Sequence, residues 1–352
     1  MKHSKHSSQH KTFIQILLLA FIVNCGFGAD YPFKYSDPKG YKTIIPKKPE
    51  RIVVGGGMWP MPSLIVMLES SAKSLIYIPK ASINAMKHSF LLDFYPEINA
   101  IQAGNSENIE ELLKLNPDLF ICHNASIKLC EAMKKSKIPT IEIGVSEWDY
   151  NSYETLKGWL DVIAPILNQE QKAQKILKWV KNIEQNASKH ASQNPPKVLI
   201  IHRFDNDKSF SIGGIFANYL LKYSGATNAI NDKNIINTTI EEIYRLNPDI
   251  IYLNNFNSLL PEDLLQSKLW QPLQAIQNKR VYKFPLGSYR PFAPGADLPI
   301  LLLWLQAQNN PKSNINVLEQ TKIYYKEVFD LNLTDTQLHS IFAPDKKAGL
   351  LE

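Results

Sequence analysis

A duplicated helix–strand unit is the sequence feature that most restricts the fold of this 352-residue chain. Residues 108–121 read NIEELLKLNPDLFI, and residues 239–252 read TIEEIYRLNPDIIY, 131 residues further along. In each copy the residues before the proline have helical spacing, and a β-rich apolar run follows at once. A helix feeding a strand, present twice at this separation, predicts two similar α/β lobes in one chain.

The starts and ends of both repeated helices are also marked in the sequence. Asn108 and Thr239 are good N-cap residues. A glutamate follows each cap by three positions, Glu111 in one copy and Glu242 in the other, which predicts a capping box at each helix. The proline of each Asn-Pro-Asp triplet disfavours further helix, so we expect the helices to end there.

Short apolar runs separated by helical stretches continue along the whole chain. Buried parallel strands have this near-continuous apolar character, and alternation with helices is typical of α/β proteins. The expected strands cover residues 51–54, 74–78, 119–122, 140–143, 198–201, 250–253 and 281–284.

A long stretch without glycine or proline connects the two halves. Apolar residues recur at helical spacing from Ala173 to Ala187, Asn168 can cap the start, and Pro195-Pro196 stops the pattern. We predict one linking helix over 168–192, between an N-terminal lobe (29–167) and a C-terminal lobe with terminal helices (193–352). A helical joint is stiffer than a Gly/Ser linker, so we expect little hinge motion.

The first 28 residues have the layout of a secretory signal peptide. A lysine-rich start precedes the apolar run 13–23, and small residues lead to a predicted cut after Gly28. The run is shorter than the roughly 20 residues that span a bilayer. Cys25 could instead carry a lipid anchor, but a lipoprotein signal requires a small residue before the cysteine, and Asn24 occupies that position. We therefore expect a periplasmic protein released by cleavage.

Charge and cysteine content exclude several classes of protein. Cleavage removes three lysines and lowers the net charge from +6 to +3, which is too mild to indicate nucleic-acid binding. The mature chain of about 320 residues is too long to fold around a single hydrophobic core of ordinary size, so two domains are expected. Only Cys122 and Cys130 would remain. An oxidising compartment permits a bridge between them, and two buried free thiols are the equal alternative.

Further segments recur in a known order and spacing. They are DPKGY at 37–41, IP at 45–46, KPERIVV at 48–54, the two IEE-x-x-x-LNPD elements, LLWL at 302–305 and the aromatic residues Tyr324, Tyr325 and Phe329. Together they resemble the class III periplasmic binding proteins, which serve ABC importers of iron-siderophores, haem, cobalamin and nickel chelates. The resemblance covers nearly the whole mature chain. It implies two Rossmann-like lobes that face each other across a ligand cleft.

Candidate ligand-binding residues follow from where the expected strands end, because open α/β lobes bind ligands beyond the carboxyl ends of their strands. Aromatic rings offer apolar area and arginine offers forked donors, which suits a bulky anionic chelate. We favour cleft roles for the two arginines, leave Trp59 and Tyr289 open between cleft and core, and expect His202 to be structural because strand alternation points it away from Arg203. The candidates are Met58, Trp59, His123, Arg203, Tyr289 and Arg290.

The spacing of possible metal ligands in the sequence indicates whether the protein binds a bare metal ion or one already bound by an organic chelator. His88 and His123 are the two histidines expected on the cleft side, and each also fits a polar surface group. A bare zinc or manganese site needs three or four protein ligands, and the mature chain has no His-x-His or Cys-x-x-Cys. We therefore expect a chelated Fe(III) or Ni(II) as cargo, iron-siderophore first and nickel chelate second, with cobalamin or haem as alternatives.

The main competing class is an exported α/β hydrolase-like enzyme. Gly55-Gly56-Gly57 lacks the full dinucleotide-binding pattern, and neither a nucleophile elbow nor a Walker lysine occurs. We therefore predict a binding protein without catalytic residues. We expect it to act as a monomer.

The resemblance also implies docking of each lobe onto arginines of the ABC permease through one acidic residue. Glu110 and Glu241 match those positions and occupy equivalent places in the two repeats. A first-turn glutamate also complements the helix dipole, which explains either residue alone. We predict that both point outward and dock on the permease and its ATPase assembly.

Overall fold

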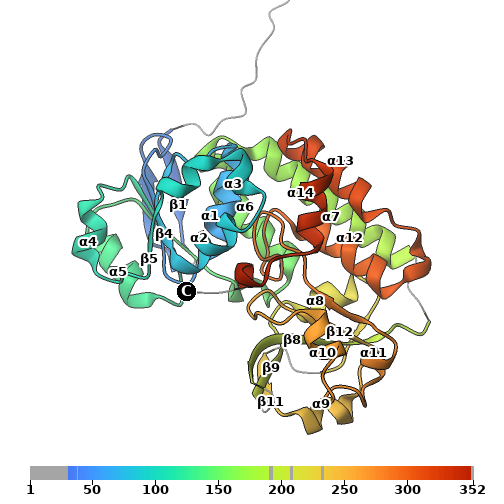
Figure 1. The fold of residues 1–352 in the computed structure, drawn as a ribbon. Helices are drawn as coiled ribbons and strands as arrows, with labels where there is room; N and C mark the ends of the chain where they lie inside the picture. The colour runs from blue at the N-terminus through green and yellow to red at the C-terminus, as the bar shows by residue number, and fades with distance from the viewer. Residues whose placement is uncertain (1–30, 38, 190–192, 207–208, 231–233, 350–352) are drawn as a thin grey trace, which may run out of the picture.

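The computed structural model describes residues 31–37, 39–189, 193–206, 209–230 and 234–349 (Figure 1). The predicted signal peptide, residues 1–28, lies outside the described residues. Figure 1 shows two α/β lobes, with the N-terminal half in blue and green and the second sheet in yellow-green and orange. The two-lobed α/β architecture predicted from the repeat is therefore confirmed.

The first lobe is built on a five-stranded parallel sheet with strand order β5-β4-β3-β6-β7. Both faces carry helices, which is why every strand except the edge strand β5 is buried along almost its whole length. An antiparallel hairpin of β1 (Phe33–Ser36) and β2 (Lys42–Ile45) precedes it. Its strands are β3 (Ile52–Gly55), β4 (Leu75–Pro79), β5 (Gln102–Gly104), β6 (Leu119–His123) and β7 (Thr140–Ile143). Its helices are α1 (Met61–Glu69), α2 (Lys80–Lys87), α3 (Leu91–Phe94), η1 (Pro96–Ala100), α4 (Ile109–Lys114), α5 (Ile127–Lys135), η2 (Ser146–Trp148) and α6 (Ser152–Leu167).

The second lobe has a mixed sheet with strand order β11-β9-β8-β12-β13, and β10 pairs with β8 off this path. β8, β12 and β13 run parallel, whereas β9 is antiparallel to β8 and to β11. Its strands are β8 (Lys197–Asn206), β9 (Ser209–Gly213), β10 (Thr227–Asn228), β11 (Ile235–Thr238), β12 (Ile250–Leu253) and β13 (Val281–Lys283). The helices that follow β8 are α8 (Ala217–Lys222), α9 (Ile240–Leu246), α10 (Pro261–Leu265), α11 (Gln274–Gln277), α12 (Leu298–Asn309), η3 (Pro311–Ser313), α13 (Val317–Phe329), α14 (Asp335–Phe342) and η4 (Lys346–Gly349).

The repeated units occupy equivalent places in the two sheets. α4 feeds β6 and α9 feeds β12, as predicted. β6 lies between β3 and β7, and β12 lies between β8 and β13, so each repeated strand pairs with the first parallel strand of its sheet. Asn116 and Asn247 follow the helices with φ of 48° and 39°, in the left-handed region that ends a helix.

The helix caps are partly as predicted. The Asn108 side chain accepts a hydrogen bond from the second backbone N–H of α4, at 3.0 Å. The two capping boxes are wrong. Glu111 accepts instead from Ser106 Oγ at 2.8 Å, and Glu242 pairs with Arg245 at 2.6 Å, because a partner within reach competes for each carboxylate.

One long helix, α7 (Glu170–Lys189), lies between the two sheets in sequence. It packs against α6 of the first lobe and against α12 and α13. Its second-lobe end is tied down, since Tyr219 Oη donates to the buried Glu184 at 2.8 Å. The predicted cap is wrong: Asn168, with φ of 57°, ends α6 rather than starting α7.

A single hydrophobic core runs through both lobes. It extends from the first sheet through α6, α7, α12 and α13 to one face of the second sheet, where Val198, Ile200, Ile250 and Tyr252 belong to it. The opposite face of the second sheet packs into a separate cluster around Trp270. Within the described residues, no helix combines the length and apolar character needed to cross a bilayer.

Candidate ligand-binding site

Aromatic and basic side chains from both lobes meet beyond the carboxyl ends of the strands. The rings of Trp59, from the loop after β3, and Phe256, from the loop after β12, lie 6.1 Å apart. His202, which in β8 directly follows the part paired with β12, lies 5.4 Å from the ring of Phe256 and 5.6 Å from that of Phe292. We call this set the inter-lobe cluster; its members are Trp59, His202, Phe256, Tyr289, Arg290 and Phe292.

Arg290 is the fully buried cation of this cluster. Its Nη1 donates to the carbonyl of Ala81 in α2, in the other lobe, and to Tyr289 Oη, each at 3.0 Å. The guanidinium carbon lies 5.1 Å from the centre of the Phe256 ring, which is within cation–π range. Burial raises the pKa of Tyr289, so its hydroxyl is protonated at neutral pH. The arginine therefore bridges the two lobes at the predicted site.

Asp297 holds the segment that presents Arg290. Its buried carboxylate accepts from Ser288 Oγ at 2.8 Å, from the Tyr289 backbone N–H at 3.0 Å and from Tyr325 Oη at 2.6 Å. Burial raises the pKa of Asp297, and these donors oppose the rise. A Cβ at Gly287 would lie 2.5 Å from the Asp297 carboxyl carbon, so only glycine permits this approach.

Lys283 holds the neighbouring loop, which carries Phe256. It ends β13 with its side chain buried, and its Nζ donates to the carbonyls of Asn254 (3.1 Å) and Asn257 (2.6 Å) and to Asn257 Oδ1 (3.2 Å). Burial lowers the pKa of Lys283 to about 7, opposed by Asp263. Two buried charged side chains thus stand directly behind the wall of the inter-lobe cluster.

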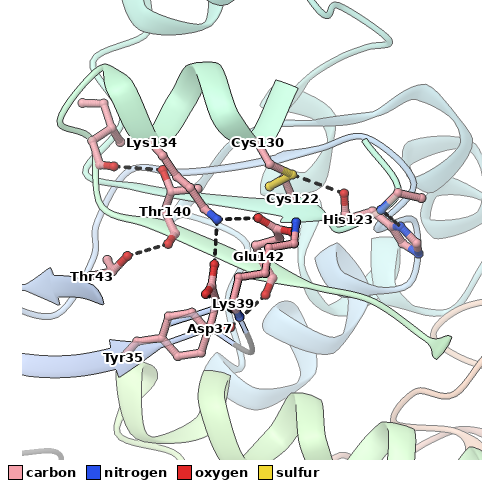
Figure 2. The surroundings of a disulfide bond; sticks show 12 residues. Tyr35, Asp37, Lys39, Thr43, Cys122, His123, Cys130, Lys134, Thr140 and Glu142 are labelled. Atoms are coloured by element: carbon pink, nitrogen blue, oxygen red, sulfur yellow. Dashed lines mark hydrogen bonds and ion pairs between the residues drawn. A yellow bond between two sulfur atoms is a disulfide. The ribbon is translucent and has the colours of Figure 1, made fainter. Parts of the chain in front are cut away.

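His123 ends β6 next to a disulfide (Figure 2). Cys122 and Cys130 are bridged, with Cα atoms 5.9 Å apart, which decides between the two alternatives left open by the sequence. The Ala125 backbone N–H donates to His123 Nδ1 at 3.0 Å, and burial lowers the pKa of His123. A neutral ring that accepts at Nδ1 carries its proton on Nε2.

A buried ion cluster lies beside that disulfide (Figure 2). Lys134 of α5 bonds to Asp37, at 2.6 Å, and to Glu142 of β7, and Lys39 also pairs with Glu142 at 2.6 Å. Burial alone would raise the pKa of Asp37 and Glu142, but the hydrogen bonds from lysine outweigh it and the pKa values are lowered. This cluster fastens the end of the β1–β2 hairpin to the first lobe, at the far edge of the sheet from β5.

The remaining candidate residues are spread over the molecule. Met58 is fully buried in the hydrophobic core, because its chain turns inward before α1. His88 is exposed at the end of α2. Arg203 is exposed, whereas its neighbour His202, expected to be structural, is the one that joins the cluster. Among the described residues no group of three His, Cys, Asp or Glu side chains is placed to hold a metal ion.

Three members of the inter-lobe cluster were missed from the sequence: His202, Phe256 and Phe292. Phe256 stands three residues beyond β12, so the rule about strand ends contained a usable signal. Phe292 follows Arg290 by two residues and stacks on Phe284 with ring centres 5.9 Å apart. The sequence alone does not distinguish it from a core ring.

A hollow of about 1190 Å³ lies elsewhere on the described surface. Its lining includes Pro196, Asp249 and Arg280, which immediately precede β8, β12 and β13. It therefore opens at the amino ends of the parallel strands. Ligands of open α/β lobes bind at the opposite ends, so we assign no ligand role to this hollow.

Glu110 and Glu241 are both exposed at the second position of their helices, α4 and α9. The outward, matched placement predicted from the repeat is confirmed. Their role in docking is taken up below.

Comparison with known proteins gives one consistent result. Residues 82–286 match the family described as periplasmic binding protein. The iron(3+)-hydroxamate-binding protein FhuD of Bacillus subtilis is 26% identical over 307 residues, which cover 79% of this chain and 90% of that protein. A periplasmic solute binding protein of Veillonella parvula superposes with a TM-score of 0.77 at 24% identity, covering 88% of this chain and 97% of the other. CeuE of Helicobacter pylori with Ni(II) bound gives 0.68 at 20% identity, covering 88% and 99%. The chain therefore belongs to the periplasmic binding protein family, and it is a substrate-binding protein of an ABC transporter rather than an enzyme.

Proposed function

We propose that this protein carries a metal chelate, held at the inter-lobe cluster, to an ABC permease. The observation that carries the proposal is the position of Arg290. It is buried between the lobes, it bonds to Ala81 across them, and aromatic rings surround it. A guanidinium in an aromatic setting suits a bulky ligand with anionic oxygens, because rings supply apolar contact and arginine supplies paired donors.

The class of chelate follows from the relatives. FhuD is named for an iron(3+)-hydroxamate, and CeuE is a structural neighbour with Ni(II) bound. We place an Fe(III)-siderophore first and a Ni(II) chelate second, with haem or cobalamin as alternatives. His88 and His123 stay candidates for a ligand to a partly coordinated metal.

The test is calorimetric titration of the purified full chain with four probes: a ferric trihydroxamate, ferric citrate, haem and Ni(II)-histidine. Arg290→Ala should weaken binding of the cognate probe by about 1.5–3 kcal/mol, the range for hydrogen bonds to charged groups. That is roughly a tenfold to hundredfold loss or more.

Arg245→Ala is the matched control, since Arg245 is exposed on α9 and pairs with Glu242. It should bind like the wild type. Equal affinity of the Arg290 variant and the control would contradict the assignment of the site. A wild type that binds none of the four probes would contradict the ligand class.

We also propose that Glu110 and Glu241 dock one lobe each onto the permease. Two exposed carboxylates at equivalent helix positions provide one contact point on each lobe. The charge reversals Glu110→Lys and Glu241→Lys together should leave chelate affinity unchanged. They should abolish stimulation of ATP hydrolysis by the permease complex in vesicles.

Glu319→Lys is the control for docking, because Glu319 is also an exposed first-turn glutamate, on α13. Like the two docking substitutions, Glu319→Lys removes a favourable charge–dipole interaction of about 0.3–1 kcal/mol at a helix start, but it leaves both docking residues in place. Normal stimulation by the double variant would refute the proposal. Loss of chelate binding in that variant would show that these residues belong to the ligand site.

The remaining organisation is proposed as follows. Residues 1–28 are cleaved on export, 29–167 and 193–352 form the two lobes, and 168–192 contain the joint. The packing of α7 against helices on both sides supports a stiff joint. The mature protein acts as a periplasmic monomer.

A further inference from the structure

The side-chain amide of Asn254 has a fixed orientation. The residue is fully buried. The backbone N–H of Asn255 lies 2.7 Å from Asn254 Oδ1, and a backbone N–H can only donate. The amide oxygen must therefore face Asn255, which leaves the amide nitrogen to face His202 Nδ1 at 2.9 Å.

This orientation fixes the tautomer of His202. An amide NH₂ group can only donate, so His202 Nδ1 must be the acceptor and cannot carry a proton. In the neutral ring the proton then sits on Nε2. Burial and, to a smaller extent, the nearby charge of Arg203 together lower the pKa of His202 to about 4, so the ring is neutral at physiological pH.

The Asn254 backbone is anchored as firmly as its side chain. Its N–H donates to Ile201 in β8 at 2.9 Å, and its carbonyl accepts from the buried Lys283 at 3.1 Å. The amide therefore cannot turn without breaking several buried hydrogen bonds, each costly to leave unmade.

The His202 ring stands within the inter-lobe cluster. It packs against Phe256 and Phe292 and is half-buried. Among the described residues, none forms a hydrogen bond with Nε2, while Phe256 continues the contact to Trp59 in the other lobe. A polar N–H between aromatic walls is available to a ligand held there.

We infer that His202 is a ligand-contacting residue that donates its Nε2–H to an oxygen of the chelate and does not coordinate the metal, with Asn254 as its positioning residue. The inference rests on the proposed function. A metal bond at Nε2 requires a lone pair on that nitrogen, and the amide at Nδ1 disfavours that state. His202 should therefore favour a chelate that presents an oxygen to its Nε2–H, and it should not itself capture a bare ion.

The first experiment reads the tautomer without any ligand. Proton–nitrogen correlation spectra of the full chain labelled at histidine nitrogens show which ring nitrogen carries hydrogen. The signal lost in His202→Phe identifies this ring. We expect protonated Nε2 and bare Nδ1 between pH 6 and 8. In Asn254→Asp the carboxylate would accept from Nδ1, so the proton should move there. A wild-type ring protonated at Nδ1 would overturn the inference.

The second experiment measures the contact to the ligand. His202→Phe keeps a ring between Phe256 and Phe292 but loses the Nε2–H donor, together with the Nδ1 acceptor of the buried Asn254 amide. We expect tenfold or more weaker binding of the ferric trihydroxamate, and a lower Tm because the buried Asn254 amide loses its acceptor. His339→Phe is the control, because His339 is exposed on α14 and belongs to no ring contact of the cluster; this variant should bind normally. The absorption band of the bound ferric chelate should be the same as in free solution.

The outcomes separate the two levels of the argument. Unchanged affinity in His202→Phe, or an absorption band that shifts on binding to the wild type but not to the variant, would overturn the inference while the site stands. A wild type that binds none of the four probes would remove both the proposed function and the contact assigned to His202, and the tautomer would then be decided by the spectra alone.

Discussion

The two lobes use buried charge in different ways. In the first lobe, Lys134 is paired with Asp37 and Glu142 beside the disulfide, where hairpin, α5 and β7 meet (Figure 2). In the second lobe, Lys283 and Asp297 lie behind the inter-lobe cluster and bond to carbonyls, hydroxyls and a backbone N–H. Within the described residues, neither of these two forms an ion pair.

This contrast separates stability from positioning. Opposite charges that share a buried site compensate each other's lost hydration, so the first arrangement holds a framework together. A buried charge bonded only to neutral groups is less well compensated, and its hydrogen bonds fix the atoms that receive them. In the second lobe, ionisation of the buried groups is therefore less favourable. Their hydrogen bonds fix the loops at the ligand site.

The largest expected effect is on the stability of the first lobe. Lys134→Met leaves two buried carboxylates without their shared cation, and breaking a buried pair in this way costs about 3–5 kcal/mol. Urea unfolding should show the loss. Lys157→Met is the control: its exposed pair with Asp161 is worth at most about 1 kcal/mol. Equal destabilisation by the two variants would remove the distinction between the lobes.

The next effect is a pH dependence that belongs to the second lobe. Lys283 has a folded pKa of about 7, far below its ordinary value near 10.5. Between these values the unfolded chain binds more protons, so the group makes stability rise with pH, by up to about 1.4 kcal/mol per pH unit. Below pH 7 both states are protonated and this contribution is constant.

Lys283→Met tests that dependence by difference. The unfolding free energy of the wild type minus that of the variant should climb from pH 7 towards pH 10 and stay flat from pH 5 to 6.5. Lys268→Met, at an exposed lysine of the same lobe, should give a flat difference throughout. A flat curve for Lys283→Met would show that its charge is not destabilised by burial.

The smallest expected effect is a change of shape on binding. If α7 is a stiff joint, the radius of gyration from small-angle scattering should be nearly the same with and without the cognate chelate. The shared core on both sides of α7 opposes large rotation of one lobe against the other. A clear contraction on binding would place a hinge elsewhere and make the lobes more independent than their packing indicates.

Seven parallel strands were predictable from the sequence, whereas the short parallel strands β5 and β10 and the antiparallel strands were not. Each of the seven expected runs forms a strand that starts within two residues of the predicted position. Parallel strands that are buried on both faces are apolar throughout, so the sequence shows them as apolar runs. β9 (SFSIG) alternates polar and apolar residues, and β11 (IINT) is apolar over only two residues, so both were missed. The caps failed where a neighbouring hydroxyl or arginine competed for the carboxylate, which local spacing does not reveal.

The site was only partly predictable, and His202 shows why. Strand alternation placed Arg203 in the site and His202 outside it. The pairing of β8 with β9 shifts register between Ile201 and Arg203, so alternation does not hold there. The sequence gives no mark of this irregularity. Arg290 was found because it follows a strand end closely, whereas its contact with Ala81 depends on how the lobes meet.

The core shared by the two lobes also determines how the molecule comes apart. Residues of the second sheet and of α6 belong to one hydrophobic cluster, so melting either lobe exposes apolar surface of the other. We therefore expect one cooperative transition rather than two, despite the duplicated architecture. Outside the cytoplasm, where ATP-driven chaperones do not act, an all-or-none molecule offers proteases no half-unfolded form to cut.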